Sequence, residues 1–257
     1  MRVGIIGYGK MGVIIRQTAL KRGHQVTVVI DRTSGKKEVT GKELTSACLP
    51  LDVIIDFSEP WSVVDNIKRY GELKLSAVIG TTGWYDKMDQ VSSLVERSGI
   101  GLLWSGNFSL GANLFFQLVR AAGRAMNLFP QYDAMVHEYH HRQKADCPSS
   151  TEQIIGNILI DTLERKSSTV TGFLDRPIES FELHISSTRG GSIPGTHQVI
   201  FDSDVDSILL EHSTRNRSGF AEGALAAAEW IQGRQGLYEM EDMMQSIIGG
   251  EENQKFI

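Results

Sequence analysis

The densest group of side chains able to do acid–base or anion-binding chemistry lies between residues 137 and 152. It includes four potential cations within five positions of an otherwise acidic chain: His140, His141, Arg142 and Lys144. A local positive site of this kind suits an anionic substrate. Histidine and lysine also suit proton transfer near neutral pH when their surroundings tune their pKa values. The segment therefore predicts a site that binds an anion and moves a proton.

A helix is expected directly after this turn, over residues 150–165. Ser149, Ser150 and Thr151 would then offer hydroxyl and backbone N–H groups at the helix N-terminus, where carboxylates bind well. The pattern Ser149-x-x-Glu152 is also that of a capping box, in which the serine serves only to start the helix. Substrate binding and capping both remain open at this point.

The same segment fits the zinc-hydrolase motif His-Glu-x-x-His at His137, Glu138 and His141. That motif needs a helix, on which two histidines one turn apart converge on a metal ion. Residues 134–139 instead alternate as in a strand, which would make the two histidines diverge. We therefore expect no metal here, and a zinc hydrolase is the distant alternative.

A second chemical motif is the run Gly7-Tyr8-Gly9-Lys10-Met11-Gly12, which matches the dinucleotide-binding pattern G-x-G-x-x-G after an expected strand. In that pattern the first glycine permits a sharp turn, the second lets the backbone approach a pyrophosphate, and the third lets helix pack against strand. The phosphates would lie at the helix N-terminus. The predicted cofactor contacts from this loop are Gly7, Gly9, Lys10, Met11 and Gly12.

Asp31 ends the second expected strand, about 20 residues after Gly12, where an acid accepts hydrogen bonds from the adenine ribose. Alone it would favour NADH, because a carboxylate repels the 2′-phosphate of NADPH. Arg32, with Lys36 and Lys37 nearby, offers cations to such a phosphate. We therefore predict that NADH and NADPH both serve as cofactors, with Asp31 and Arg32 in contact with them.

Two further loops follow expected strands at the same sheet edge. In a doubly wound sheet, ligands lie beyond the carboxyl ends of the strands. We therefore predict contacts to the nicotinamide half of the cofactor from both loops, through Gly80, Thr81, Thr82, Ser105, Gly106, Asn107 and Phe108.

The elements that position these residues divide the chain in two. The first hundred residues alternate short β-branched runs with amphipathic stretches, which is typical of a parallel sheet covered by helices. The expected strands are Arg2–Ile6, Gln25–Ile30, Asp52–Phe57, Ala77–Ile79 and Gly101–Trp104. The predicted class is therefore α/β, a Rossmann-type doubly wound parallel sheet plus a second α+β domain with a mixed sheet.

The second domain is expected to begin near Ser109. Its predicted elements are a helix over 110–128, a strand over 134–139, the helix over 150–165, and strands over 181–187, 196–201 and 207–213. Two final helices, over 221–232 and 239–248, have no sheet of their own and would pack back onto the first domain. We predict a dinucleotide-binding domain of residues 1–108 and 220–257, and a substrate-binding and oligomerisation domain of residues 109–219.

Composition excludes several classes of protein. The 257 residues carry 26 Lys+Arg against 31 Asp+Glu, a net charge of −5, which argues against a nucleic-acid binder. No apolar run approaches the ~18 residues of a membrane span. Cys48 and Cys147 lie far apart, which fits a reducing compartment. We expect a cytoplasmic protein that acts on a small molecule, without nucleic-acid or membrane partners.

The turn also carries a specific resemblance. Glu138-x-His140-His141-x-x-Lys144-x-Asp146-x-Pro148-Ser149-x-Thr151 resembles the signature of the dihydrodipicolinate reductase family. The resemblance extends over nearly the whole chain, in order through Gly7–Gly12, Asp56-Phe57-Ser58, Gly80–Gly83, Asn107-Phe108-Ser109, Arg189-Gly190-Gly191 and Gly195-x-His197.

This resemblance implies an NAD(P)H-dependent oxidoreductase. Its reaction would be the reduction of 4-hydroxy-tetrahydrodipicolinate, a cyclic dicarboxylate, to tetrahydrodipicolinate in diaminopimelate and lysine biosynthesis. It further implies that His140 and Lys144 are the catalytic acid–base pair, and that a homotetramer forms through the sheet of the second domain. The substrate carboxylates would be bound by His141, Ser149, Ser150 and Thr151.

One residue departs from the family pattern. Ser150 stands where the family has glycine, and its Cβ and hydroxyl would crowd backbone that must approach a carboxylate. The alternative function is therefore a diverged member that binds dinucleotide but has altered or lost substrate activity.

Overall fold

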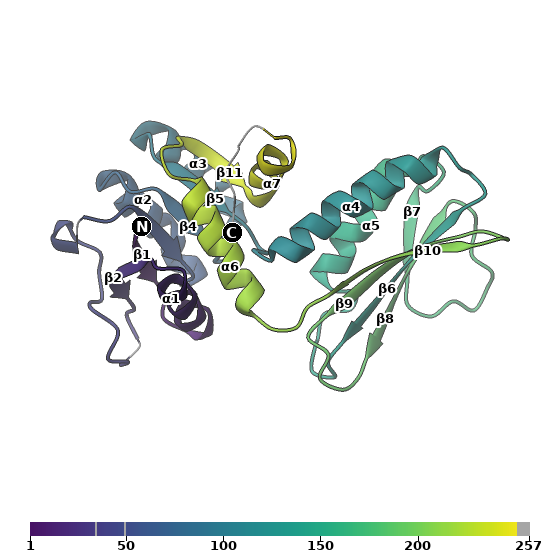
Figure 1. The fold of residues 1–257 in the computed structure, drawn as a ribbon, viewed down its shortest axis with the longest axis horizontal. Helices are drawn as coiled ribbons and strands as arrows, with labels where there is room; N and C mark the ends of the chain where they lie inside the picture. Colours follow the sequence, from purple (N-terminus) through teal and green to yellow (C-terminus); the bar gives the residue numbers. More distant parts are fainter. Residues whose placement is uncertain (34, 49, 251–257) are drawn as a thin grey trace. The chain divides into compact units, whose positions relative to one another are not determined.

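A computed structural model describes residues 1–33, 35–48 and 50–250 of the chain. The chain divides into two compact units: unit 1 comprises Met1–Asn113 with Arg217–Ile257, and unit 2 comprises Leu114–Asn216 (Figure 1). The last seven residues of the predicted first domain, 251–257, lie outside the described residues. Among the described helices, none has the length and apolar character needed to cross a membrane.

Unit 1 is built on a six-stranded parallel sheet with the order β11-β5-β4-β3-β1-β2. Strand β1 pairs with β2 on one side and with β3 on the other, so the strand order reverses between β1 and β3. Ligands of such sheets bind beyond the carboxyl ends of the strands at this reversal. The strands are β1 (Arg2–Ile6), β2 (Gln25–Ile30), β3 (Val53–Asp56), β4 (Ala77–Ile79), β5 (Gly101–Trp104) and β11 (Gly236–Glu239).

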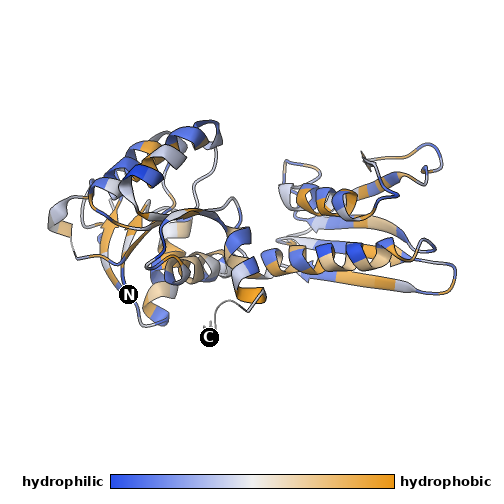
Figure 2. Ribbon diagram, turned by 90° about the horizontal axis from the view of Figure 1, so that it is seen from above, coloured by the Kyte–Doolittle hydropathy of each residue, from blue (hydrophilic) through white to orange (hydrophobic). Residues whose placement is uncertain are grey.

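Helices cover both faces of this sheet, and each face has its own core. One core joins the sheet to α1 (Lys10–Lys21), α6 (Ser218–Trp230) and α7 (Met240–Ile248). The other joins it to α2 (Val63–Glu72) and α3 (Met88–Ser98). The strands are apolar along most of their length (Figure 2), as burial on both faces requires. Three short 3₁₀ turns complete the unit: η1 (Ser46–Cys48), η2 (Pro60–Ser62) and η3 (Tyr85–Lys87).

Unit 2 holds a five-stranded mixed sheet with the order β10-β9-β6-β8-β7. Strand β6 runs parallel to β8 and antiparallel to β9. Its elements are α4 (Leu110–Asn127, which begins in unit 1), β6 (Asp133–His140), α5 (Ser150–Thr162), β7 (Ser168–Thr171), β8 (Glu182–Arg189), β9 (Thr196–Asp202) and β10 (Ser207–Ser213). Helices α4 and α5 lie side by side against one face of the sheet (Figure 1).

The predicted fold class is confirmed, with changes at the level of single elements. Strands β7 and β11 were not predicted, and β11 occupies the four residues before the last helix. Because Glu239 ends β11 and caps α7, the expected start of that helix moves to Met240. Helix α5 ends at Thr162 rather than at residue 165.

Candidate functional site

The glycine loop of unit 1 has a separate geometric reason for each glycine. Gly7 has a φ of +85°, and a Cβ there would stand 2.3 Å from the carbonyl oxygen of Phe57. A Cβ on Gly12 would stand 2.1 Å from the carbonyl oxygen of Gly7, so α1 packs on the loop only with glycine there. At Gly9 a Cβ would meet no protein atom within 4 Å. Gly9 therefore faces open space, as a cradle for a bulky anion requires.

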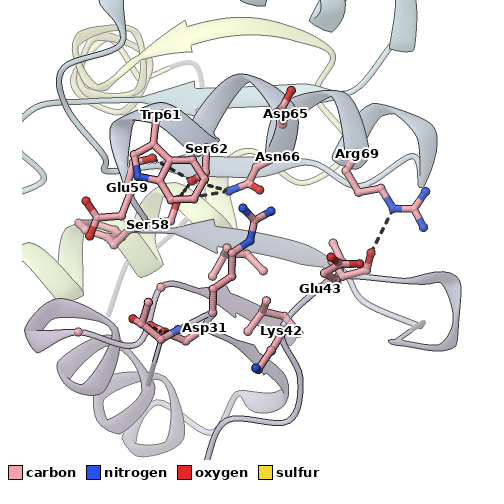
Figure 3. A pocket seen from close by; sticks show the side chains of 18 of the residues that line it. Asp31, Lys42, Glu43, Ser58, Glu59, Trp61, Ser62, Asp65, Asn66 and Arg69 are labelled. Atoms are coloured by element: carbon pink, nitrogen blue, oxygen red, sulfur yellow. Dashed lines mark hydrogen bonds between the residues drawn. The ribbon is translucent and has the colours of Figure 1, made fainter. Parts of the chain in front are cut away.

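A cavity of about 340 Å³ opens beside this loop, at the carboxyl ends of β1, β2 and β3 (Figure 3). It lies at the reversal of strand order, where a dinucleotide is expected. Four predicted cofactor residues line it: Gly7, Gly9, Asp31 and Arg32. Sequence reasoning missed the rest of its polar lining, which includes Lys42, Ser58, Trp61, Asn66 and Arg69.

Asp31 lies on the β2 side of this cavity (Figure 3), and Arg32, the next residue along the chain, also lines it. The Asp31 carboxylate accepts hydrogen bonds from the backbone N–H groups of Tyr8 at 2.6 Å and Thr33 at 2.8 Å, so it ties β2 to the glycine loop. The Thr33 hydroxyl also donates to this carboxylate, at 3.1 Å. The Arg32 guanidinium lies 5.3 Å from the centre of the ring of Trp61, which lines the same cavity.

The two further loops meet at the carboxyl ends of β4 and β5. The N–H of Ser105 donates to the carbonyl of Ile79 at 3.1 Å, which joins the loops at their starts. Thr82 and Gly106 are exposed, whereas Thr81 is buried. Phe108 belongs to the core instead: it is 2% exposed and its ring lies 5.8 Å from that of Phe57. Packing therefore occupies the Phe108 ring, and a cofactor contact at this residue stays a prediction.

In unit 2, the predicted acid–base pair lies at the end of β6 and in the turn after it. His140 is 6% exposed, and its Nδ1 lies 3.1 Å from the carbonyl oxygen of Pro194. The Lys144 ammonium is less buried and donates to both carboxylate oxygens of Asp146, at 2.8 and 2.9 Å. His141 follows, half-buried, and lines a surface hollow with Arg142 and Gly191.

The three predicted carboxylate ligands at the start of α5 differ in exposure and in role. Ser149 is buried and caps the helix: its hydroxyl accepts from the N–H of Glu152 at 3.2 Å. Ser149 therefore caps the helix. The second hydrogen bond of a capping box, between the Glu152 side chain and the backbone N–H of Ser149, is absent, because the Glu152 carboxyl contacts His197. Ser150 is exposed and Thr151 half-buried, and both N–H groups belong to the first turn, where no intrahelical carbonyl accepts them. These two residues remain free to meet an anion.

A buried cluster that sequence reasoning did not assign lies behind His140. Glu138 and Glu152 have no exposed surface, and His197 is 4% exposed. Burial would raise the pKa of Glu138, yet hydrogen bonds from Ser149, Arg189 and Ser187 lower it to about 2. Burial and the charge of Glu138 raise the pKa of Glu152 to about 9. Burial lowers the pKa of His197 to about 4.

The zinc motif does not form. His137, Glu138 and His141 lie on and just after a strand, and the His137 ring points to the face opposite Glu138, where its Nδ1 meets the Ser186 hydroxyl at 2.6 Å. A different trio does come together: ligand atoms of Glu138, His140 and His197 lie within 4.8 Å of one another.

Family models decide which proteins this chain is related to. The model described as dihydrodipicolinate reductase, N-terminus, matches residues 1–108, and that described as dihydrodipicolinate reductase, C-terminus, matches residues 111–244. The chain belongs to the dihydrodipicolinate reductase family. This family consists of oxidoreductases, and its two models account for both units.

Relatives within the family match along most of their length. The chain is 30% identical to the 4-hydroxy-tetrahydrodipicolinate reductase of Christiangramia forsetii over 96% of this chain and 99% of that protein. It is 36% identical to that of Methanoregula boonei over 82% of each. A structure of dipicolinate-bound dihydrodipicolinate reductase from Paenisporosarcina sp. TG-14 superposes with a TM-score of 0.78 at 24% identity, covering 95% of this chain and 99% of that one. That likeness shows the fold.

The departure from the family pattern at Ser150 has no backbone cost. Ser150 is the first residue of α5, and Lys74 is the only non-glycine residue with positive φ in the described part of the chain. Serine at this position is therefore compatible with the ordinary helical backbone at the start of α5. What serine adds is a Cβ and a hydroxyl on an exposed surface.

Proposed function

We propose that this chain catalyses the NAD(P)H-dependent reduction of 4-hydroxy-tetrahydrodipicolinate to tetrahydrodipicolinate, a step of diaminopimelate and lysine biosynthesis. The observation that carries the proposal is the match of both family models, one over each half of the chain. The dinucleotide cradle of unit 1 and the cationic turn of unit 2 supply the two kinds of binding that such a reaction needs. The cytoplasm is the proposed compartment, with free Cys48 and Cys147 in support.

The residues of unit 1 fit a dinucleotide. Gly9 leaves space for a pyrophosphate, and Lys10 and Met11 begin the helix whose N-terminus would face it. Asp31 would accept from the ribose hydroxyls and Arg32 would meet a 2′-phosphate. Gly80, Thr82, Ser105, Gly106 and Asn107 would bind the nicotinamide half. When bound, the dihydronicotinamide supplies a hydride.

The residues of unit 2 would bind the dicarboxylate and complete the reduction. The N–H groups of Ser150 and Thr151 and the side chain of His141 would hold carboxylates, because a helix N-terminus and a cation both favour negative charge. Reduction adds a hydride to the ring and leaves electron density that must take up a proton. Lys144 would donate that proton at the substrate, with His140 as the second member of the pair.

The assay that tests this proposal generates the substrate by condensing pyruvate with aspartate semialdehyde and follows NADH and NADPH absorbance in separate runs. We expect substrate-dependent oxidation of both cofactors. Lys144→Ala and His140→Ala should each lower kcat by about a hundredfold or more with cofactor affinity little changed. Near-normal kcat in both variants would refute the acid–base assignment. Cofactor binding without turnover in the unmodified protein would favour the diverged-member alternative.

We further propose that the protein is a homotetramer assembled through the sheet of unit 2. The face of this sheet opposite α4 and α5 carries a row of directly paired apolar side chains: Met135, Ile200 and Leu209. Met135 is 38% exposed and Leu209 is 54% exposed, so the described part of the chain leaves this row open to solvent. A second copy of the same chain would bury it.

Light scattering tests the assembly. Leu209→Asp should lower the measured mass below that of a tetramer. Leu128→Asp is the matched control, because Leu128 is 75% exposed in the same unit but lies beyond the end of α4, off this face. An unchanged mass for Leu209→Asp would contradict assembly through the sheet.

A further inference from the structure

The buried face of β6 carries two titratable side chains in line with apolar ones. Ala134 and Val136 begin this face, and Glu138 and His140 continue it, because side chains alternate across a strand. A carboxylate among buried groups is costly unless it is paired and hydrogen-bonded. The partners of Glu138 therefore decide what it does.

The two oxygens of Glu138 have different surroundings. Oε1 accepts three hydrogen bonds, from the N–H of Ser149 at 3.0 Å, the hydroxyl of Ser187 at 2.8 Å and the guanidinium of Arg189 at 2.7 Å. Oε2 accepts none from the residues that the structure describes. It faces Nε2 of His140 at 3.3 Å and Nδ1 of His197 at 3.9 Å. One oxygen is thus fixed by the protein and the other faces two imidazole rings.

In the neutral state of His140, the ring nitrogen that faces Oε2 of Glu138 is an acceptor, so two acceptor atoms face each other. Its Nδ1 lies 3.1 Å from the carbonyl oxygen of Pro194, which can only accept, so Nδ1 carries the hydrogen. Nε2 of the neutral ring is then an acceptor, buried and without a hydrogen-bond partner among the described residues. A proton added at Nε2 turns the contact with Oε2 into a charge-assisted hydrogen bond, which satisfies both atoms at once.

We propose that Glu138 is the positioning residue that lets His140 take up and hold its proton for the reduction. The inference rests on the proposed reductase function. Because Nε2 faces Oε2 inside the protein, His140 would hold the proton behind the site, and Lys144 remains the more exposed member of the pair that meets the substrate. Burial holds the pKa of His140 below its ordinary value, and the charge of Glu138 opposes part of this shift.

The other groups around His140 leave this role to Glu138. Lys144 and a charged His197 would lower the pKa of His140, and Arg189 is already paired with Glu138. His197 stays neutral near pH 7, because burial holds its pKa at about 4. The remaining acids are engaged elsewhere: Glu152 keeps its own proton and donates it to Nδ1 of His197 at 2.5 Å, and Asp146 pairs with Lys144.

The test replaces Glu138 with glutamine and follows the ring of His140 by NMR. Glutamine keeps the size and an oxygen acceptor but removes the negative charge. We expect the titration midpoint of His140 to fall by about one pH unit or more. In the pH profile, the loss of kcat with rising pH should move to lower pH by the same amount, because His140 must be protonated. At pH 7.5 kcat should fall about tenfold, with a smaller change in KM.

Glu152→Gln is the matched control for this variant. Glu152 is as fully buried as Glu138, but it is already uncharged near pH 7, so the substitution removes no charge. The midpoint of His140 should stay in place. A midpoint in Glu138→Gln equal to that of the unmodified protein would overturn the proposal.

The unmodified protein supplies a second measurement in case Glu138→Gln fails to fold. The ¹⁵N shifts of neutral His140 must show the Nδ1–H tautomer, and an Nε2–H tautomer would overturn the proposal. Stoichiometric zinc in the purified protein would overturn it too, because a metal held by the trio of Glu138, His140 and His197 would occupy Nε2. These readings need no substrate, so a protein that fails to turn over would count against the proposed function and leave this test intact.

Discussion

Arg32 is the residue through which NADPH binding can be separated from NADH binding. Its guanidinium lies over the Trp61 ring, and both residues line the cavity beside the glycine loop. Arg32→Ala removes the cation that would meet a 2′-phosphate. Hydrogen bonds to charged groups contribute about 1.5–3 kcal/mol. An exposed cation–π contact contributes about 0.5–1 kcal/mol, which Arg32 forfeits if it leaves Trp61 to reach the phosphate.

The net loss for NADPH is therefore about 0.5–2.5 kcal/mol, or roughly a 2- to 70-fold weaker affinity. NADH has no 2′-phosphate, so its affinity should change by less than about threefold. Dissociation constants from calorimetric titration, and KM values from initial rates with each cofactor, measure the two effects.

Arg69→Ala is the control for Arg32→Ala. Arg69 lines the same cavity, but its guanidinium is held by the carbonyl of Leu44 at 3.1 Å and the carboxylate of Glu72 at 2.8 Å. Its loss should not distinguish the cofactors. Equal weakening of NADH and NADPH in Arg32→Ala would refute the reasoning, because the charge at position 32 would then not recognise the phosphate.

Three other predictions follow from the geometry. Gly9→Ala should leave the melting temperature unchanged but weaken dinucleotide binding at least about tenfold, because the new Cβ would fill the space proposed for the pyrophosphate. Gly35→Ala is the control, since a Cβ there also meets no protein atom within 4 Å, and it should change neither property. Ser150→Gly should not raise kcat/KM, because Ser150 is an unstrained first residue of α5; a tenfold rise would favour the diverged-member alternative. The folded chain keeps a proton on Glu152 up to about pH 9, while the unfolded chain loses it near pH 4.5, so the Glu152 contribution to stability falls as pH rises. His197 makes stability rise with pH, the opposite trend, only below its unfolded pKa of about 6.5. From pH 6.5 to 9 the free energy of urea unfolding of Glu152→Gln should therefore grow relative to that of the unmodified protein, by at most about 1.4 kcal/mol per pH unit. A difference that stays constant with pH would contradict the protonated state of Glu152.

The sequence predicted the parts of the fold that local pattern determines. Strands of unit 1 are apolar runs bounded by turns, so β1 and β2 have the predicted bounds. β7 and β11 were missed because Ser168–Thr171 and Gly236–Glu239 are short and lack a clear apolar alternation. Each segment is a strand because it pairs with the edge of a sheet formed by residues elsewhere in the chain. A short window of sequence does not contain that pairing partner.

The candidate site shows the same division. The glycine loop and the turn after β6 are contiguous, so their residues could be named from the sequence. The cluster around Glu138 gathers residues far apart in the chain, because β6 pairs with β8 and β9 and places Glu138 opposite His197. One signal was available: Glu138 shares the phase of Ala134 and Val136, which puts a charged residue on the core face of the strand.

The discontinuity of unit 1 fixes an order of events during synthesis. Helix α6 packs on α1, and a Cβ on Gly223 would stand only 1.7 Å from the carbonyl oxygen of Phe108, so the first core closes only around this returning segment. Strand β11, which completes the sheet edge beside β5, comes later still. On the ribosome, the nucleotide cradle therefore emerges first but waits for the helix that completes its core, while the continuous unit 2 has all its residues available earlier. A nascent chain halted before Arg217 would therefore expose the apolar face that α6 covers, and unit 1 is most prone to aggregate at that stage.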